Sequence, residues 1–295
     1  MHVSDDPLAE EAIKKIIAGS NYWPADEDLG FLQEAESRGL RLQLEYLKAD
    51  AILRQHHIAN TIVVFGSTRI EERQVAESRL QETRRRLALA PDDTNLRQKS
   101  DVAERLLAKS HYYEIARELG RKVGLAGMDG QRDRTVIMTG GGPGIMEAAN
   151  RGATDVAALS VGLNVTMPHE QFPNPYITPE LCLQFRYFAL RKLHFALRAK
   201  ALVVFPGGFG TMDELFEILE LSQTRKMPPV PVVLVGEAYW RKAFDADFLV
   251  AEGVIDADDR KLFWFAESAD SIWSSILQWH AARGTPLLGT KRARP

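Results

Sequence analysis

The most informative segment of this chain reads Ala201-Leu-Val-Val-Phe-Pro-Gly-Gly-Phe-Gly-Thr-Met-Asp-Glu214. Its first five residues are apolar and largely small or β-branched, which predicts a buried strand. The glycines that follow can take a positive φ or let a ligand lie against bare backbone, and Thr211 stands where a helix N-cap belongs. This construction predicts an anion site, because unpaired N–H groups and the positive end of the helix dipole then face the carboxyl edge of the sheet.

Two acidic residues, Asp213 and Glu214, enter the predicted helix in what we expect to be its first turn. Acidic side chains there complement the helix dipole, which is a purely structural role. The functional alternative is that a carboxylate faces the ligand. This alternative is stronger for Glu214, because a second element of the same construction lies upstream.

That second element runs from Thr135 to Asn150, where a short apolar strand leads into a glycine cluster and a helix is expected to open at Gly144 or Ile145. Neither glycine loop is a P-loop, because the Gly-Lys-Ser/Thr ending that grips a β,γ-phosphate and magnesium is missing. The first predicted strand leads into Gly66-Ser-Thr-Arg69 and not into the dinucleotide fingerprint of the Rossmann dehydrogenases. Two such loops in one chain indicate an anion-binding site much more strongly than one loop does.

The order of strands and helices predicts an α/β fold with a doubly wound, Rossmann-like, mainly parallel sheet that has helices on both faces. We expect strands at residues 61, 135, 159, 201 and 231, with the ligand at their carboxyl edge. Two charged helical patterns, Glu71 to Leu89 and Asp92 to Leu119, predict a helical hairpin inserted after the first strand. The predicted organisation is a helical N-terminal extension (1–58), a nucleotide-binding catalytic domain (59–283) with its insertion (71–119), and a flexible tail (284–295).

Three motifs resemble those of a known family. Pro206-Gly-Gly-Phe-Gly-Thr-Met-Asp-Glu214 is similar to the P-G-G-x-G-T-x-x-E motif of the Lonely Guy (LOG) family, once labelled "lysine decarboxylase-like". Arg191-Lys192 resembles the family's second signature, and the segment from Gly140 to Asn150 resembles the glycine loop of its longer members. The resemblance implies a phosphoribohydrolase, in which water cleaves the N-glycosidic bond of a nucleoside 5′-monophosphate without a cofactor or a metal.

The resemblance assigns catalysis to Glu214 and Arg191. Glu214 would bind ribose hydroxyls and either stabilise an oxocarbenium-like sugar or direct water. Arg191 keeps its charge permanently, which makes it a better clamp or electrostatic stabiliser than a proton donor. The predicted substrate- and phosphate-binding residues are Ser67, Gly141, Gly142, Gly144, Glu147, Lys192, Gly207, Gly208, Gly210 and Thr211.

Some of these assignments have structural alternatives. Ser67 is equally consistent with a capping role, and Glu147 with complementing the dipole of its own helix. Family members commonly carry a second glutamate just before the last residue of the motif, and here that position holds Asp213. Because the last position is retained as Glu214, the difference bears on selectivity more than on activity.

Composition limits the partners of the chain. It has 295 residues, a net charge of −3 and one cysteine, Cys182. Nucleic-acid binding needs a basic face, which this charge balance argues against, and a single cysteine suits a reducing compartment. The sequence shows neither a secretory signal pattern nor an apolar run of membrane-spanning length. We therefore expect a cytoplasmic protein, by resemblance a homodimer or higher oligomer, with a nucleotide substrate and no nucleic-acid or membrane partner.

Three function classes remain to be compared. The enzyme hypothesis needs Glu214 and Arg191 together, whereas a nucleotide or cofactor carrier on the same fold would keep the glycine loops without needing the carboxylate. The decarboxylase label would require pyridoxal phosphate and a Schiff-base lysine. The only lysines near the motif, Lys192 and Lys200, have no such context. The base stays open among adenine, another purine, a pyrimidine and an N6-substituted adenine.

Overall fold

The computed structural model describes residues 7–128, 133–167 and 172–287. The chain divides into two compact units, Met1–Lys48 and Ala49–Pro295. The first unit is helical, with α1 (Pro7–Ala18), a 3-10 turn (Ser20–Tyr22), α2 (Leu29–Gln33) and the start of α3 (Arg38–Gln55). The Asp28 side chain caps α2 by accepting a hydrogen bond from the Phe31 N–H at 3.0 Å.

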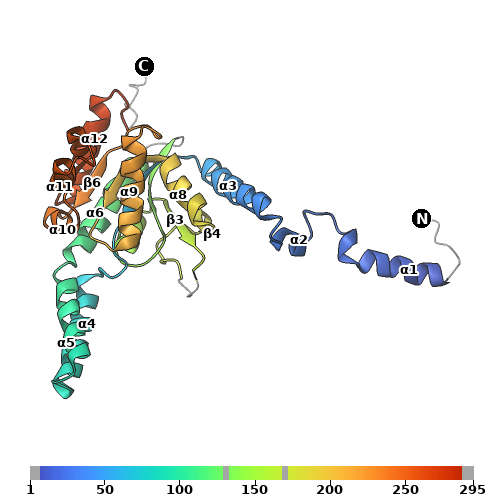
Figure 1. The fold of residues 1–295 in the computed structure, drawn as a ribbon, viewed down its shortest axis with the longest axis horizontal. Helices are drawn as coiled ribbons and strands as arrows, with labels where there is room; N and C mark the ends of the chain where they lie inside the picture. The colour runs from blue at the N-terminus through green and yellow to red at the C-terminus, as the bar shows by residue number, and fades with distance from the viewer. Residues whose placement is uncertain (1–6, 129–132, 168–171, 288–295) are drawn as a thin grey trace. The chain divides into compact units, whose positions relative to one another are not determined.

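The second unit contains a seven-stranded parallel sheet, of which β3, β4 and β6 are labelled in Figure 1. The strand order is β4-β3-β2-β1-β5-β6-β7, so the chain winds outward from β1 in both directions. This confirms the predicted doubly wound fold and all five predicted strands. The strands are β1 (Ile58–Phe65), β2 (Arg134–Thr139), β3 (Ser160–Val165), β4 (Cys182–Phe185), β5 (Ala199–Val204), β6 (Val232–Val235) and β7 (Phe263–Ala266).

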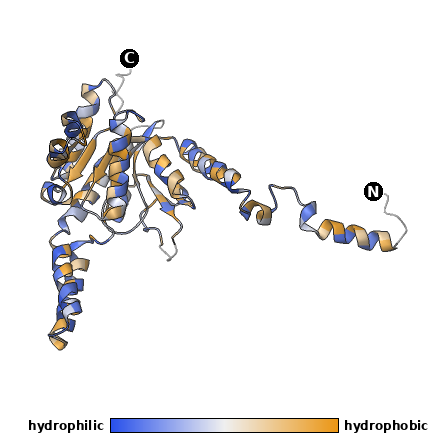
Figure 2. Ribbon diagram, viewed as in Figure 1, coloured by the Kyte–Doolittle hydropathy of each residue, from blue (hydrophilic) through white to orange (hydrophobic). Residues whose placement is uncertain are grey.

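Helices cover both faces of the sheet because successive strand residues point to opposite sides. In β1, Val63 and Phe65 join one core cluster, whereas Ile62 and Val64 join the other. Burial on both faces makes the strands predominantly apolar, as the orange of the strands in Figure 2 shows. The first cluster includes residues of α3 from Ala49 onward, of α8 (Phe188–Leu197), of α9 (Phe209–Gln223) and of α10 (Glu237–Ala243). The second includes residues of α6 (His111–Gly127), α7 (Ile145–Asp155) and α12 (Ala269–Ala282).

The excursion after β1 differs from its prediction. It begins with α4 (Arg73–Leu89) and α5 (Thr94–Leu107), which pack together, but the single helix predicted for Asp92 to Leu119 is wrong. The chain turns between Leu107 and His111, and α6 then lays its apolar face on the sheet. That face comprises Tyr112, Tyr113, Ala116, Leu119 and Val123. Residues 111–119 therefore belong to the layer that covers the sheet.

The remaining elements are α11 (Ala246–Ala251) and 3-10 helices at Pro179–Leu181 and Ala257–Leu262. None of the described helices is long and apolar enough to span a bilayer. The predicted domain boundaries stay predictions, and residues 288–295 of the predicted tail lie outside the described residues.

Candidate active site

A cavity of about 660 Å³ lies at the carboxyl edge of the sheet. It is lined by segments that follow β1, β2, β3, β5 and β6, together with residues of α8 and α9. We call it the main cavity. Seven of the twelve predicted site residues line it: Ser67, Arg191, Gly207, Gly208, Gly210, Thr211 and Glu214.

The glycine turn after β5 opens α9 earlier than predicted. Gly208 is the N-cap and the helix begins at Phe209, so the N-cap predicted at Thr211 is wrong. The reason is that the Thr211 and Met212 N–H groups both donate to the Gly208 carbonyl at 3.0 Å, which closes the first turn around that residue. Glu214 consequently lies in the second turn of α9 and not in the first, which weakens its explanation as a dipole-complementing residue.

The start of α9 presents open donors to the main cavity. The N–H groups of Phe209 and Gly210 have no carbonyl four residues back within the helix. A Cβ built on Gly208 or Gly210 would meet no atom within 4 Å, so bare backbone borders free space. By contrast, a Cβ on Gly207 would lie 2.1 Å from the Thr211 hydroxyl oxygen. The turn is therefore packed against the protein at Gly207 and open to the solvent at Gly208 and Gly210, as an anion site requires.

Glu214 sits between two cations of α8. Its carboxylate lies 3.6 Å from Arg191 Nη2 and 3.4 Å from Lys192 Nζ, and its side chain is only 5% exposed. Burial raises the pKa of Glu214 above its ordinary value, and the charges of Lys192 and Arg191 oppose this shift. The result is a desolvated carboxylate that still borders the main cavity.

Arg191 is held by aromatic rings more than by carboxylates. Its guanidinium lies over the Phe188 ring at 4.6 Å and the Phe195 ring at 5.7 Å, and its contact with Glu214 is a single long one. Its Nε is buried without a hydrogen-bond partner among the described residues. Burial lowers the pKa of Arg191 and Glu214 raises it, with burial the larger effect. Arg191 also lines the main cavity, so its side chain borders the space in which a ligand would lie.

Lys192 is held by carboxylates of α9. It is absent from the described lining of the main cavity and contacts three carboxylates on α9: Asp213 at 2.8 Å, Glu217 at 2.9 Å and Glu214. Burial alone would lower its pKa, but hydrogen bonds to Asp213 and Glu217 and the charge of Glu214 raise it overall. Lys192 is therefore a fixed ammonium that positions Glu214 from behind, and direct substrate contact by it stays a prediction.

Ser67 joins the two glycine loops. Its N–H donates to the Pro206 carbonyl at 2.9 Å, and its carbonyl accepts the Ile145 N–H at 3.1 Å. Its hydroxyl oxygen accepts the Arg69 N–H at 3.1 Å, which is the local capping alternative, while the side chain also lines the main cavity. The hydroxyl proton remains to be donated to a ligand.

The second glycine loop serves packing. Gly144 has a φ of +71°, and a Cβ there would lie 2.4 Å from the Ser67 carbonyl oxygen. The Gly141 N–H donates to the Thr139 hydroxyl at 3.0 Å, and the Ile145 N–H is already taken by Ser67. The described lining of the main cavity includes Gly140 but not Gly141, Gly142 or Gly144. Phosphate contacts by those three glycines stay a prediction that this geometry does not favour.

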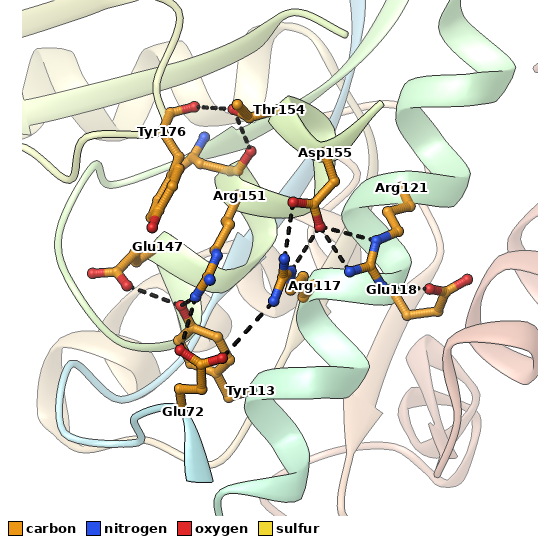
Figure 3. A network of polar contacts seen from close by, with 11 residues as sticks. Glu72, Tyr113, Arg117, Glu118, Arg121, Glu147, Arg151, Thr154, Asp155 and Tyr176 are labelled. Atoms are coloured by element: carbon orange, nitrogen blue, oxygen red, sulfur yellow. Dashed lines mark hydrogen bonds and ion pairs between the residues drawn. The ribbon is translucent and has the colours of Figure 1, made fainter. Parts of the chain in front are cut away.

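Glu147 points away from the main cavity into a polar network (Figure 3). The Tyr113 hydroxyl donates to it at 2.9 Å and accepts from Arg151, which also pairs with Glu72 at 2.9 Å. Its neighbour Met146 lines the cavity instead, because adjacent helical residues point about 100° apart. The predicted ribose contact of Glu147 is not supported by this orientation.

Several residues in the lining were not predicted. Tyr239 of α10 donates its hydroxyl to the Gly207 carbonyl at 2.5 Å and so braces the glycine turn from the next strand–helix unit. Asn164 lies at the carboxyl end of β3, and Lys109 comes from the junction of α5 and α6. Their positions depend on tertiary packing, and the only sequence signal is their place at element ends. Among the described residues, no group of three His, Cys, Asp or Glu side chains is placed to hold a metal ion.

Fold and site together define a Rossmann-like α/β protein with a cavity at the carboxyl edge of its sheet. A family model described as "Possible lysine decarboxylase" matches residues 146–276. The chain is 27% identical over 177 residues to the cytokinin riboside 5′-monophosphate phosphoribohydrolase LOG4 of Arabidopsis thaliana, a match that spans 58% of this chain and 77% of that protein. It is 28% identical over 165 residues to the cytokinin riboside 5′-monophosphate phosphoribohydrolase LOG of Oryza sativa subsp. japonica. That match spans 55% of this chain and 64% of that protein. These matches support the resemblance of the chain to the Lonely Guy family.

Solved structures with a related fold include the Moco carrier protein from Chlamydomonas reinhardtii, at 19% identity and a TM-score of 0.44, covering 76% of this chain and 98% of that one. Another is the molybdenum cofactor binding protein from Rippkaea orientalis, at 20% identity and a TM-score of 0.40, covering 57% and 87%.

Proposed function

We propose that this chain hydrolyses the N-glycosidic bond of a nucleoside 5′-monophosphate of the AMP or cytokinin riboside monophosphate type, releasing the free base and ribose 5-phosphate. The observation that supports this most directly is Glu214, a buried carboxylate that borders the main cavity beside two cations and the open start of α9. The activity for which the relatives are named, phosphoribohydrolase action on a cytokinin riboside 5′-monophosphate, supports the same reaction class.

The chemistry needs a negative charge beside the sugar. As the bond from C1′ to the base breaks, its electron pair leaves with the base and positive charge develops on the ribose. Glu214 stabilises that charge in a desolvated site, where an electrostatic interaction is stronger than in water. Water adds its oxygen to C1′, one of its protons is lost, and the departing base takes up a proton. Arg191 supplies charge and donors to the anionic substrate before the chemistry begins.

The 5′-phosphate is assigned to the start of α9. Its open N–H groups at Phe209 and Gly210 and the helix dipole favour an anion at that place. Arg69 and Lys109 also line the main cavity, which adds positive charge to it. In this proposal the phosphate lies in the same cavity as Glu214, as a nucleoside monophosphate requires.

A pyridoxal-dependent decarboxylase fits the site poorly. A Schiff-base lysine must lose its proton to react with an aldehyde. Lys192 is surrounded by three carboxylates that raise its pKa, and Lys200 lies at the opposite, amino end of β5. The older family label therefore finds no support in this geometry.

The test is chromatography of free bases after incubation of the full chain with a panel of nucleoside 5′-monophosphates. We expect at least one purine monophosphate to yield its base and ribose 5-phosphate in equal amounts. Binding of the monophosphates without any base release would instead favour a nucleotide or cofactor carrier on the same fold.

The pKa of Glu214 predicts a pH dependence. The carboxylate must be ionised, so kcat/KM should rise with pH through a pKa above the ordinary 4.5. Because the Lys192 charge lowers this pKa, Lys192→Gln should move the acid limb to still higher pH. Lys122→Gln is the matched control, since Lys122 pairs with Asp270 on the surface. An acid limb below 4.5, or one that both substitutions shift equally, would contradict the assignment.

We also propose a homodimer, as the family resemblance implies. Apolar side chains that remain exposed on α8 and α9 include Phe188, Leu193, Leu197 and Phe216. Light scattering at micromolar concentration should give about twice the chain mass of 33.1 kDa. Leu193→Glu combined with Leu197→Glu should reduce this mass, whereas Leu89→Glu, at an exposed position on α4, should not. A single 33.1 kDa species of the unsubstituted chain would overturn the proposal.

A further inference from the structure

A second hollow lies at the amino edge of the sheet, opposite to the main cavity. Two cavities of about 480 and 500 Å³ share the segment 227–230, Trp279 and Arg283 in their linings, so they form one continuous groove. Lys200 at the start of β5 and Val230 just before β6 line it. In a parallel sheet these amino ends lie at the edge opposite to the carboxyl ends. We call this feature the amino-edge groove.

The amino-edge groove is strongly basic. None of its described lining residues is acidic, although the whole chain carries a net charge of −3. Lys261 pairs with Asp258 at 2.6 Å, and the other lining cations form no ion pair with a described residue. The lining cations are Lys200, Arg225, Lys226, Lys261 and Arg283.

The groove is also held in shape by contacts that need no ligand. Arg283 stacks on the Trp279 ring at 3.9 Å, and His280 of α12 bonds the Lys200 carbonyl through Nε2 at 2.7 Å. Pro228 and Pro229 restrict the backbone of one wall. A cationic site with rigid walls loses little conformational freedom when an anion binds.

A structural explanation accounts for part of this charge. The helices α9 and α12 both end at the groove, and cations near a helix C-terminus complement its dipole. That explains Arg225 and Arg283, which follow those helices. It does not explain Lys200, which lies on a strand, or the absence of acidic side chains from the described lining.

We propose that the amino-edge groove binds a small anion that carries two or more phosphate groups. Several cations spread over two joined cavities match a chain of phosphates better than a single one, because each phosphate oxygen pair accepts charge-assisted hydrogen bonds from one or two cationic side chains. Inorganic polyphosphate and the phosphate tail of a nucleotide share this chemistry. The site is separate from the main cavity and does not rest on the proposed hydrolysis.

Calorimetric titration of the full chain with inorganic tripolyphosphate, and separately with ATP, tests this. The Arg225→Gln, Lys226→Gln double variant and the single variants Lys200→Gln and Arg283→Gln should each bind tripolyphosphate at least about tenfold more weakly. Their binding of AMP should be unchanged. The Arg84→Gln, Arg85→Gln variant on α4 removes two cations elsewhere and should bind tripolyphosphate like the unsubstituted chain. Tighter binding of ATP than of tripolyphosphate would identify a nucleotide as the ligand.

Three results would overturn the proposal. The first is the absence of tripolyphosphate binding by the unsubstituted chain at millimolar concentration. The second is an equal loss of binding in the α4 control, which would show a general effect of net charge. The third is a tripolyphosphate affinity that only Gly210→Ala reduces, because the anion would then occupy the start of α9. Thermal melting of each variant separates these results from misfolding.

Discussion

Glu214→Gln is expected to lower kcat for AMP hydrolysis by on the order of 10²-fold or more, with much smaller change in substrate affinity. Glutamine keeps the volume and most hydrogen bonds of the side chain but removes its charge. The lost interaction is strongest when positive charge develops on the ribose, so the transition state is affected more than the bound substrate. Steady-state kinetics of AMP hydrolysis and calorimetric binding of AMP measure the two effects separately.

The matched control is Glu217→Gln. Glu217 lies one turn further along α9 and contacts the same lysine at 2.9 Å, but it is absent from the described lining of the main cavity. It should retain most of the activity. An equal loss in both variants would show that the charge balance around Lys192 matters and that Glu214 has no special place beside the sugar. Unchanged hydrolysis by Glu214→Gln would remove it from the mechanism altogether.

Arg191 provides a complementary comparison. Arg191→Ala should reduce both AMP affinity and rate, because a guanidinium beside an anionic substrate acts before and during the chemistry. It would also remove a cation that opposes the raised pKa of Glu214. We therefore expect Glu214→Gln to lower mainly kcat, and Arg191→Ala to lower kcat and raise KM.

The fold could be predicted because its signals are local. The strand at residues 201–205 and the glycines after it are legible from the order of residue types, and parallel strands bring their carboxyl ends to one edge. Glu214 and Arg191 come from different helices, yet both line the main cavity as the motif resemblance led us to expect. Their proximity of 3.6 Å follows from the packing of α8 beside α9 on one face of the sheet.

The division of labour between the glycine loops could not be predicted. Both loops have a strand, glycines and a helix in that order. A Cβ at Gly208 or Gly210 would meet no atom within 4 Å, whereas one at Gly141 or Gly144 would meet a neighbouring atom at 2.0 or 2.4 Å. In the other loop the Ser67 carbonyl takes the N–H of Ile145, and Asn164 fills the side of Gly141. These partners come from other strand ends, so no local pattern distinguishes the two loops.

Helix starts and orientations were a second source of error. Thr211 has the side chain of an N-cap, but the glycine at 208 adopts the extended conformation that begins the helix three residues earlier. Glu147 was predicted to face the ligand, but it points away from the main cavity. Its direction on the helix differs by about 100° from that of Met146, which lines the cavity. Lys109 lines the cavity because it lies in the turn between α5 and α6. The prediction of one helix over this segment gave no sign of that turn.

Adenosine is expected to have a kcat/KM on the order of 10³-fold or more below that of AMP. Without the 5′-phosphate, the oriented N–H groups of Phe209 and Gly210 lose their anionic partner, and a site built around hydrogen bonds to a substrate group discriminates strongly against an analogue that lacks it. Base release from the two compounds, measured at concentrations well below saturation, gives the ratio directly. Equal turnover of adenosine and AMP would remove the basis for placing the phosphate at α9.

Gly210→Ala tests whether the phosphate of AMP binds at the start of α9, when AMP and adenosine are compared as substrates. An alanine at this helical position meets no protein atom within 4 Å and favours the helix, so folding should be retained, but its methyl group enters the space beside the open N–H groups. We expect kcat/KM for AMP to fall at least about tenfold and kcat/KM for adenosine to change little. The preference for AMP over adenosine should therefore become smaller. Gly39→Ala is the matched control, because that helical glycine also has open space and lies outside the described lining of the main cavity. An equal loss for AMP and adenosine in Gly210→Ala would place the methyl group against the sugar or base, and the phosphate site would then have to lie elsewhere in the cavity.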